Sequence, residues 1–137
     1  MKDQNNVTTM KDIGIALKQN KPGELAKAVN AIANAKVNIE GFSEIEGKFH
    51  CVTDDPKGTI KALESAGFTP TETDVLVFGA EDQPGYLANV LRGLADQEVN
   101  VITSYVLTNT RIALGVDQPA RVKETLQEFA PQAAHRR

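Results

Sequence analysis

Two Pro-Gly dipeptides mark the residues best suited to hold a small charged molecule. Pro22-Gly23 and Pro84-Gly85 each follow the predicted end of a strand and precede a predicted helix. The first turn of a helix has backbone N–H groups without intrahelical partners, which attract a carboxylate, and glycine lets a ligand approach the backbone. An Asx residue, Asn20 or Asp82, stands two positions before each dipeptide. The candidate binding residues at the two helix starts are Asn20, Pro22, Gly23, Glu24, Asp82, Gly85 and Tyr86.

An asparagine follows each of these predicted helices. Asn38 and Asn100 open the next predicted strands, and an amide side chain offers donors and an acceptor to the amine and carboxylate of a free amino acid. A purely structural explanation competes with binding, because Asn and Asp near helix ends often satisfy local backbone groups and Pro-Gly shapes turns. Spacing alone favours the structural interpretation and leaves both open.

No constellation in the sequence predicts an enzyme. His50 and Cys51 are adjacent in a predicted strand, so their side chains point to opposite faces and cannot form a thiolate–imidazole pair. Asp54-Asp55-Pro56 is typical of a capped helix start rather than of an acid–base pair. His135 is the second of two histidines, which leaves no metal-ligand cluster with recognisable spacing. We therefore expect no catalytic residues, no metal and no cofactor.

The composition is that of a globular protein with one ordinary domain or two small ones. The chain has 137 residues, of which 41% are hydrophobic and 24% charged, with a net charge of −3. Without a basic surplus, neither nucleic acid nor an anionic membrane is an expected partner. No segment reaches the roughly 18 apolar residues of a membrane span. The single cysteine excludes an internal disulfide, which favours a cytoplasmic location.

The sequence repeats itself after 62 residues. Residues 20–39 align with residues 82–101, and seven of these twenty positions are identical. In the first copy an alternating strand at 13–17 precedes a helix with a single apolar stripe, as expected for a helix that covers a sheet. Two strands joined by Glu46-Gly47-Lys48, a second helix from Pro56 and a strand at 68–73 complete the copy.

The second copy has the same order but ends early. Its first strand is predicted to present Val75, Val77 and Gly79 on one face, and strands at 99–107 and 111–116 and a helix at 119–129 follow its first helix. After that helix the pattern stops. We expect residues 6–10, or a partner subunit, to supply the missing fourth strand.

This element order, β-α-β-β-α-β, is the split arrangement of ferredoxin-like domains. The predicted fold class is α+β, with two ferredoxin-like units whose antiparallel sheets carry their helices on one face. Residues 11–73 form the first predicted unit and residues 74–130 the second.

The Pro-Gly-x-Leu-Ala pattern, followed by an apolar-striped helix and then Val-Asn-Ile or Val-Asn-Val, resembles the ACT domain, a module that senses small molecules. The resemblance occurs twice and covers residues 11–129. It implies a tandem ACT protein that binds a free amino acid where ACT domains meet and regulates a partner enzyme. In serine-inhibited members of the family, a His-x-Asn-x-Pro-Gly pattern and the later Asn hold the effector. Here Lys18 replaces the His, and Asp82 replaces the first Asn in the second copy.

The resemblance implies a regulatory module without an attached catalytic domain, similar to stand-alone tandem ACT proteins, and it favours a homodimer with a metabolic enzyme as partner. The alternative is an interaction protein whose ACT units are structural and bind no ligand, with a sheet edge or a surface of Phe42, Tyr86 and Tyr105 as the contact. A small enzyme is a third and weaker hypothesis. RNA binding is weaker still, because the strands at 48–52 and 111–114 lack paired stacking aromatics.

Overall fold

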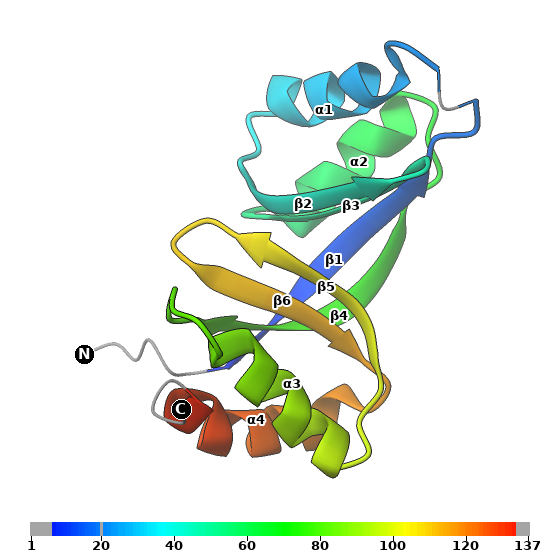
Figure 1. Cartoon of the computed structure of the whole chain (residues 1–137). Coiled ribbons are helices and arrows are strands. Elements are labelled where there is room, and N and C mark those ends of the chain that lie inside the picture. The colour runs from blue at the N-terminus through cyan, green and yellow to red at the C-terminus, as the bar shows by residue number, and fades with distance from the viewer. Residues whose placement is uncertain (1–6, 20, 134–137) are drawn as a thin grey trace. The chain divides into compact units, whose positions relative to one another are not determined.

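The computed structural model describes residues 7–19 and 21–133, with side chains described through residue 128. Four helices and six strands follow one another within these residues (Figure 1), and every strand pair given below is antiparallel. Their bounds are β1 Thr8–Ala16, α1 Glu24–Asn34, β2 Ile39–Ile45, β3 Lys48–Thr53, α2 Pro56–Ser65, β4 Thr71–Gly79, α3 Tyr86–Asp96, β5 Val101–Leu107, β6 Arg111–Val116 and α4 Pro119–Ala133. None of the described helices is long and apolar enough to cross a bilayer.

Contacts divide the chain into two compact units. The first-copy unit is Lys11–Thr73, and the second-copy unit joins Asp74 onward with the residues up to Met10. β1 and β4 each contribute residues to both units. The strands predicted at 68–73 and from Val75 onward are parts of one continuous nine-residue strand, β4.

In the first-copy unit, β3 lies between β1 and β2, with Ile13 opposite Cys51 and Phe42 opposite Cys51 on the other side. The predicted hairpin turn is confirmed: Glu46 and Gly47 have φ values of 49° and 85°, which a tight turn between twisted strands requires. α1 and α2 cover one face of this sheet (Figure 1). Their apolar stripes and the inward strand residues form a core of Ile13, Ile15, Leu17, Ala28, Ile32, Val37, Phe49, Cys51 and Leu63.

The start of α2 follows the predicted chemistry. Asp55 caps the helix by accepting a hydrogen bond from the Gly58 N–H at 3.0 Å, and Pro56 stands in the first turn, where its missing N–H costs nothing. Asp55 is therefore the helix cap, as predicted, whereas the Asp54 carboxylate contacts the backbone of Asn38 instead of this helix.

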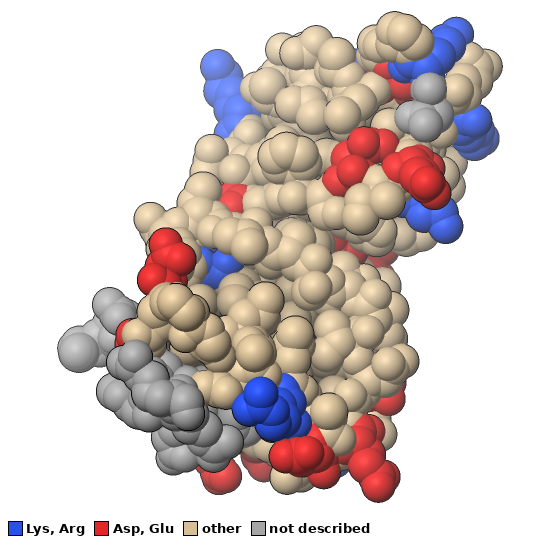
Figure 2. All heavy atoms as spheres, viewed as in Figure 1, with Lys and Arg blue, Asp and Glu red and all other residues tan. Residues whose placement is uncertain are grey.

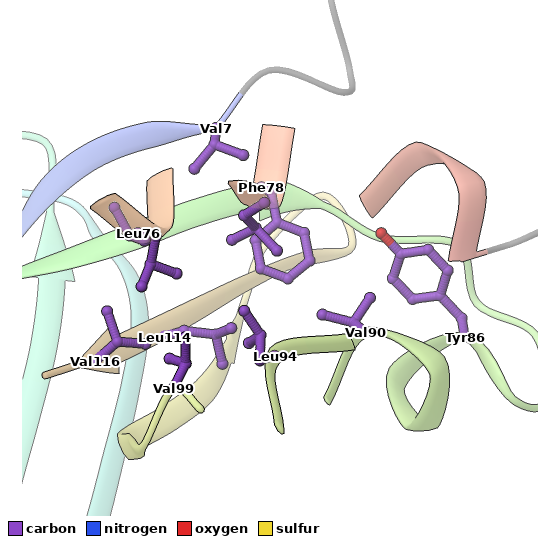
Figure 3. Close-up of a cluster of buried hydrophobic side chains, with 11 residues drawn as sticks. Val7, Leu76, Phe78, Tyr86, Val90, Leu94, Val99, Leu114 and Val116 are labelled. Carbon is purple, nitrogen blue, oxygen red and sulfur yellow. The ribbon is translucent and has the colours of Figure 1, made fainter. Parts of the chain in front are cut away.

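In the second-copy unit, β6 lies between β4 and β5, and α3 and α4 cover the sheet (Figure 1). The core side chains from β4 are Leu76 and Phe78 (Figure 3), and Ala80, which follows the strand, packs against the same cluster. The sequence pattern placed Val75, Val77 and Gly79 on one face of this strand, and the residues between them, Leu76 and Phe78, are the ones that pack against the helices. Val75 through Phe78 are all buried, and an unbroken apolar run carries no alternation from which the face can be chosen.

Val7 joins this second core although it lies near the other end of the sequence (Figure 3). Its side chain is 3% exposed and belongs to the same cluster as Leu76 and Phe78. The N-terminal segment therefore packs into the second-copy unit. That it serves as the fourth strand of a ferredoxin-like fold remains a prediction, as does the two-domain division at residues 73 and 74.

Candidate functional site

Both Pro-Gly dipeptides start a helix, as predicted. α1 begins directly after Gly23 and α3 directly after Gly85, and the two glycines have φ values of 92° and 89°. This left-handed conformation favours glycine, because a Cβ strains it. Neither helix has a side-chain cap at this residue. Both copies thus share one backbone feature, a glycine in the left-handed conformation at the junction between a loop and a helix.

The first backbone N–H group of each of these two helices already has a hydrogen-bond acceptor. The Glu24 N–H donates to the Lys21 carbonyl at 3.1 Å, and the Tyr86 N–H donates to the Gln83 carbonyl at 3.3 Å. The expectation that Glu24 and Tyr86 present unpaired amides to a ligand is therefore wrong. The left-handed glycine closes a tight turn, and the turn carbonyl satisfies the amide that the sequence pattern left without a partner.

A cavity of about 160 Å³ lies beside the start of α1 in the first-copy unit. The end of β1, the first turns of α1 and the loop that follows α2 enclose it. Its lining residues are Ala16, Lys18, Glu24, Lys27, Ala66, Gly67, Phe68 and Thr69. α2 ends just before this loop, and Gly67 has a φ of 94°, so the chain turns away there and leaves the space open.

The lining combines two cations, one carboxylate and an aromatic ring. The Lys27 Nζ lies 5.6 Å from the centroid of the Phe68 ring, within the range of a cation–π contact. The Glu24 Oε1 accepts a hydrogen bond from the Gln19 N–H at 3.2 Å, and its charge in the first turn suits the helix dipole. Lys18 is exposed at the rim. Figure 2 shows acidic and basic side chains interspersed at this end of the unit (upper right).

In the second-copy unit a tyrosine occupies the corresponding space. Gly79 and Ala16 are equivalent, because each is the last residue of its strand to pair with the neighbouring strand. The Tyr86 side chain is 4% exposed, and its hydroxyl donates to the Gly79 carbonyl at 3.2 Å. Tyr86 belongs to the hydrophobic core of this unit (Figure 3), and α4 continues to Ala133 instead of ending early as α2 does.

The asparagines after the helices do not meet the helix starts within one unit. Asn38 lies beyond the end of α1, and the 11 residues of that helix span about 16 Å at 1.5 Å per residue. The Asn38 N–H donates to the Asp54 Oδ1 at 3.0 Å, and the Asn100 N–H makes the matching contact with Asp117 at 3.4 Å. Asn20 and His135 lie outside the described residues.

Sequence analysis missed the residues that line most of the cavity. Lys18 was noted only as a replacement for a family histidine, and Lys27 carried no signal beyond its exposed helical position. The loop at 66–69 was predicted as a helix stop and the beginning of a strand. Three segments distant in sequence build this cavity, and only the packing of α1 beside α2 brings them together.

A hydrogen bond between Asp12 and His50 had no signal in the sequence. Asp12 is 3% exposed and lies 2.8 Å from the Nδ1 of His50, because β1 and β3 are neighbours. Cys51 points to the opposite face, as predicted, into the first core. Burial, assisted by the Asp12 carboxylate, raises the pKa of the Cys51 thiol to about 12. Among the described residues, no three His, Cys, Asp or Glu side chains gather as metal ligands.

The predicted aromatic contact surface is wrong in two of its three members. Phe42 is 59% exposed, but Tyr86 is 4% and Tyr105 is 9% exposed. A period-two or helical pattern cannot distinguish a surface tyrosine from a buried one whose hydroxyl has found a partner.

Comparisons with known proteins identify the fold. No protein-family model matches the chain, and no curated protein matches it. Protein BT0572 from Bacteroides thetaiotaomicron is similar in structure, with a TM-score of 0.78, 26% identity and coverage of 90% of both chains. The regulatory subunits of aspartate kinase from Thermus flavus and, in ligand-free form, from Thermus thermophilus have TM-scores of 0.68 and 0.65. Their identities are 17% and 18%, and the matches cover 93% of this chain and 96% and 95% of theirs. The chain therefore shares the mixed α/β fold of these regulatory subunits.

Proposed function

We propose that this protein is a regulatory module with two ACT units that binds a free amino acid and controls a partner enzyme. The cavity beside α1 carries the proposal, since it joins cations, a carboxylate and an aromatic ring in about 160 Å³. Amino acids carry an ammonium and a carboxylate that such a lining complements. The fold shared with regulatory subunits of aspartate kinase supports a regulatory rather than a catalytic role.

The chemistry of the most reactive side chains supports the same conclusion. A nucleophilic cysteine requires a lowered pKa, whereas burial raises the pKa of Cys51 to about 12. His50 is hydrogen-bonded to Asp12 on the opposite face of the sheet from Cys51. These residues therefore act in folding, and we assign no catalytic role to any described residue.

In this proposal Asn38 contacts a ligand that is bound at the α1 start of a second copy of the chain. Because Asn38 and Gly23 lie at opposite ends of α1, one amino acid can touch both only if one of them belongs to another ACT unit. A homodimer in which two α1 helices run antiparallel supplies that arrangement. Ligand binding then favours one packing of the units over another, and the partner enzyme responds to the change in population.

Thermal unfolding in the presence of each of the twenty amino acids tests the proposal. A ligand at about ten times its Kd adds about 1.4 kcal/mol to the free energy of unfolding, which raises Tm by several degrees. Ala66→Leu fills the cavity from the end of α2 and should abolish the shift. Ala95→Leu, at an exposed position of α3, is the matched control and should retain it. If no amino acid stabilises the protein, the proposed function is wrong.

An interaction module without a ligand is the second candidate, favoured by the apolar side chains that β2 exposes. Phe42 and Ile45 are 59% and 67% exposed, so both side chains are accessible to a protein partner. In this case a partner enzyme binds equally well with and without amino acids, and Phe42→Ser reduces its binding whereas Ala66→Leu does not.

A further inference from the structure

We infer that the ligand of the first-copy unit is an acidic amino acid, one with a second carboxylate in its side chain. This inference rests on the proposed function and specifies the class of ligand for the same cavity. Three observations carry it: the charges that line the cavity, its size, and the different side chains at the equivalent place in the second-copy unit.

The charges favour a ligand with a net negative charge. Lys18 and Lys27 supply two positive charges and Glu24 one negative charge, and the positive end of α1 adds to the cationic side. A neutral amino acid pairs one ammonium with one carboxylate and leaves one lysine without a counter-charge. An acidic amino acid places its ammonium at Glu24 and a carboxylate at each lysine, so every charge meets its opposite. A basic amino acid adds a third cation and is repelled.

The backbone contributes less than the lysines to this selection. The Glu24 N–H already donates to the Lys21 carbonyl, so carboxylate binding depends on side chains. Lys27 is held in place, because its ammonium group lies over the Phe68 ring at 5.6 Å, and a held side chain loses less entropy when a ligand binds. The lysines are therefore the residues that recognise the second carboxylate.

The size of the cavity fits a small ligand. A cavity of about 150 Å³ accommodates benzene, with six heavy atoms, and this one measures about 160 Å³ and opens to solvent. Aspartate and glutamate have nine and ten heavy atoms by their chemical formulae, so an acidic amino acid fits with one end toward the opening. A larger aromatic amino acid leaves much of its ring in water.

The second-copy unit is not expected to bind the same ligand. Tyr86 replaces Glu24 in the alignment of the two copies and fills the space with its ring, which is held by the hydroxyl contact with Gly79. Ala80 and Asn89 align with Lys18 and Lys27, so both cations are also absent. One chain therefore binds one acidic amino acid.

Isothermal titration of the full chain with each of the twenty amino acids tests the inference. Glutamine and asparagine are the matched controls for glutamate and aspartate, because each amide has the shape of its acid without the charge. We expect one acidic amino acid to bind about tenfold more tightly than its amide, the effect of one charge-assisted hydrogen bond. Raising the salt concentration should weaken binding of the acid more than that of the amide. A neutral or basic amino acid that binds as tightly as the acids overturns the inference and leaves the proposed function intact. Failure of all twenty amino acids to bind overturns both.

Variants locate the selectivity in the cavity. Lys18→Met and Lys27→Met keep most of the side-chain stem and remove the charge, so each should weaken glutamate or aspartate binding about tenfold and leave amide binding nearly unchanged. Lys57→Met removes an exposed lysine at the opposite end of α2 and should bind like the original protein. Far-ultraviolet circular dichroism verifies that each variant folds. An unchanged ratio of acid to amide affinity in both cavity variants contradicts the inference, even if an acidic amino acid binds.

Discussion

Truncation of Val7 is the sharpest test of how the N-terminal segment stabilises the second-copy unit. Val7 is 3% exposed in a core with Leu76 and Phe78, and Val7→Ala removes two buried methyl groups. At about 0.8 kcal/mol for each such group, the lost transfer energy is about 1.6 kcal/mol, and a residual cavity brings the total to about 2 kcal/mol. For a chain of this length, that loss lowers Tm by roughly 6 to 10 °C.

Val106→Ala is the matched control, because the same side chain is removed from the same unit at a position that is 68% exposed. We expect it to cost about 0.5 kcal/mol, mainly through lower strand propensity. Urea denaturation followed by circular dichroism measures both variants through their midpoints. Removal of residues 1–9 should destabilise the protein more than Val7→Ala. Equal midpoints for the two valine variants, or an unchanged melting curve after truncation, refute the role assigned to this segment.

Three further predictions concern the helix starts and the cores. Gly23→Ala should lower the free energy of unfolding by about 1 to 2 kcal/mol, because alanine is strained at a φ of 92°, and Gly23→Asn should cost less in the same urea assay. Tyr86→Phe should cost about 1 kcal/mol, since it leaves the Gly79 carbonyl without the hydroxyl donor; no change in the midpoint contradicts the assigned contact. The raised pKa of Cys51, about 12 against an ordinary 9.0, predicts stability that is complete below pH 9. It then declines toward pH 12 at up to about 1.4 kcal/mol per pH unit. Cys51→Ala should flatten that decline, and Ellman's reagent should react with the native thiol only after unfolding.

Local signals in the sequence predicted the elements and turns of the fold. A left-handed glycine, an Asp-Pro helix start and a hairpin turn each depend on a few adjacent residues, so Gly23, Asp55 and Gly47 lie where the patterns placed them. The face of β4 was missed because four consecutive apolar residues are buried. The second copy is also offset by one residue in its strands, since the loop between Gly79 and Gly85 is one residue shorter than that between Ala16 and Gly23.

The candidate site was predictable only in part. The start of α1 was visible in the repeat, but the cavity beside it depends on where α2 ends and on how Phe68 and Lys27 meet across two helices. No alignment of the two copies reveals that Tyr86 turns inward while Glu24 stays at the surface of its unit. Such packing follows from tertiary contacts, which a one-dimensional pattern does not contain.

A ¹H–¹⁵N nuclear magnetic resonance titration of the full chain with glutamate and aspartate shows whether an acidic amino acid binds in the cavity beside α1. We expect saturable shifts of the backbone amides of Glu24, Lys27, Gly67 and Thr69, which line the cavity, and little change at Gly85 in the second-copy unit. Saturable shifts centred on Gly85, or no shift at any amide with either of these ligands or with the other amino acids, would contradict this expectation.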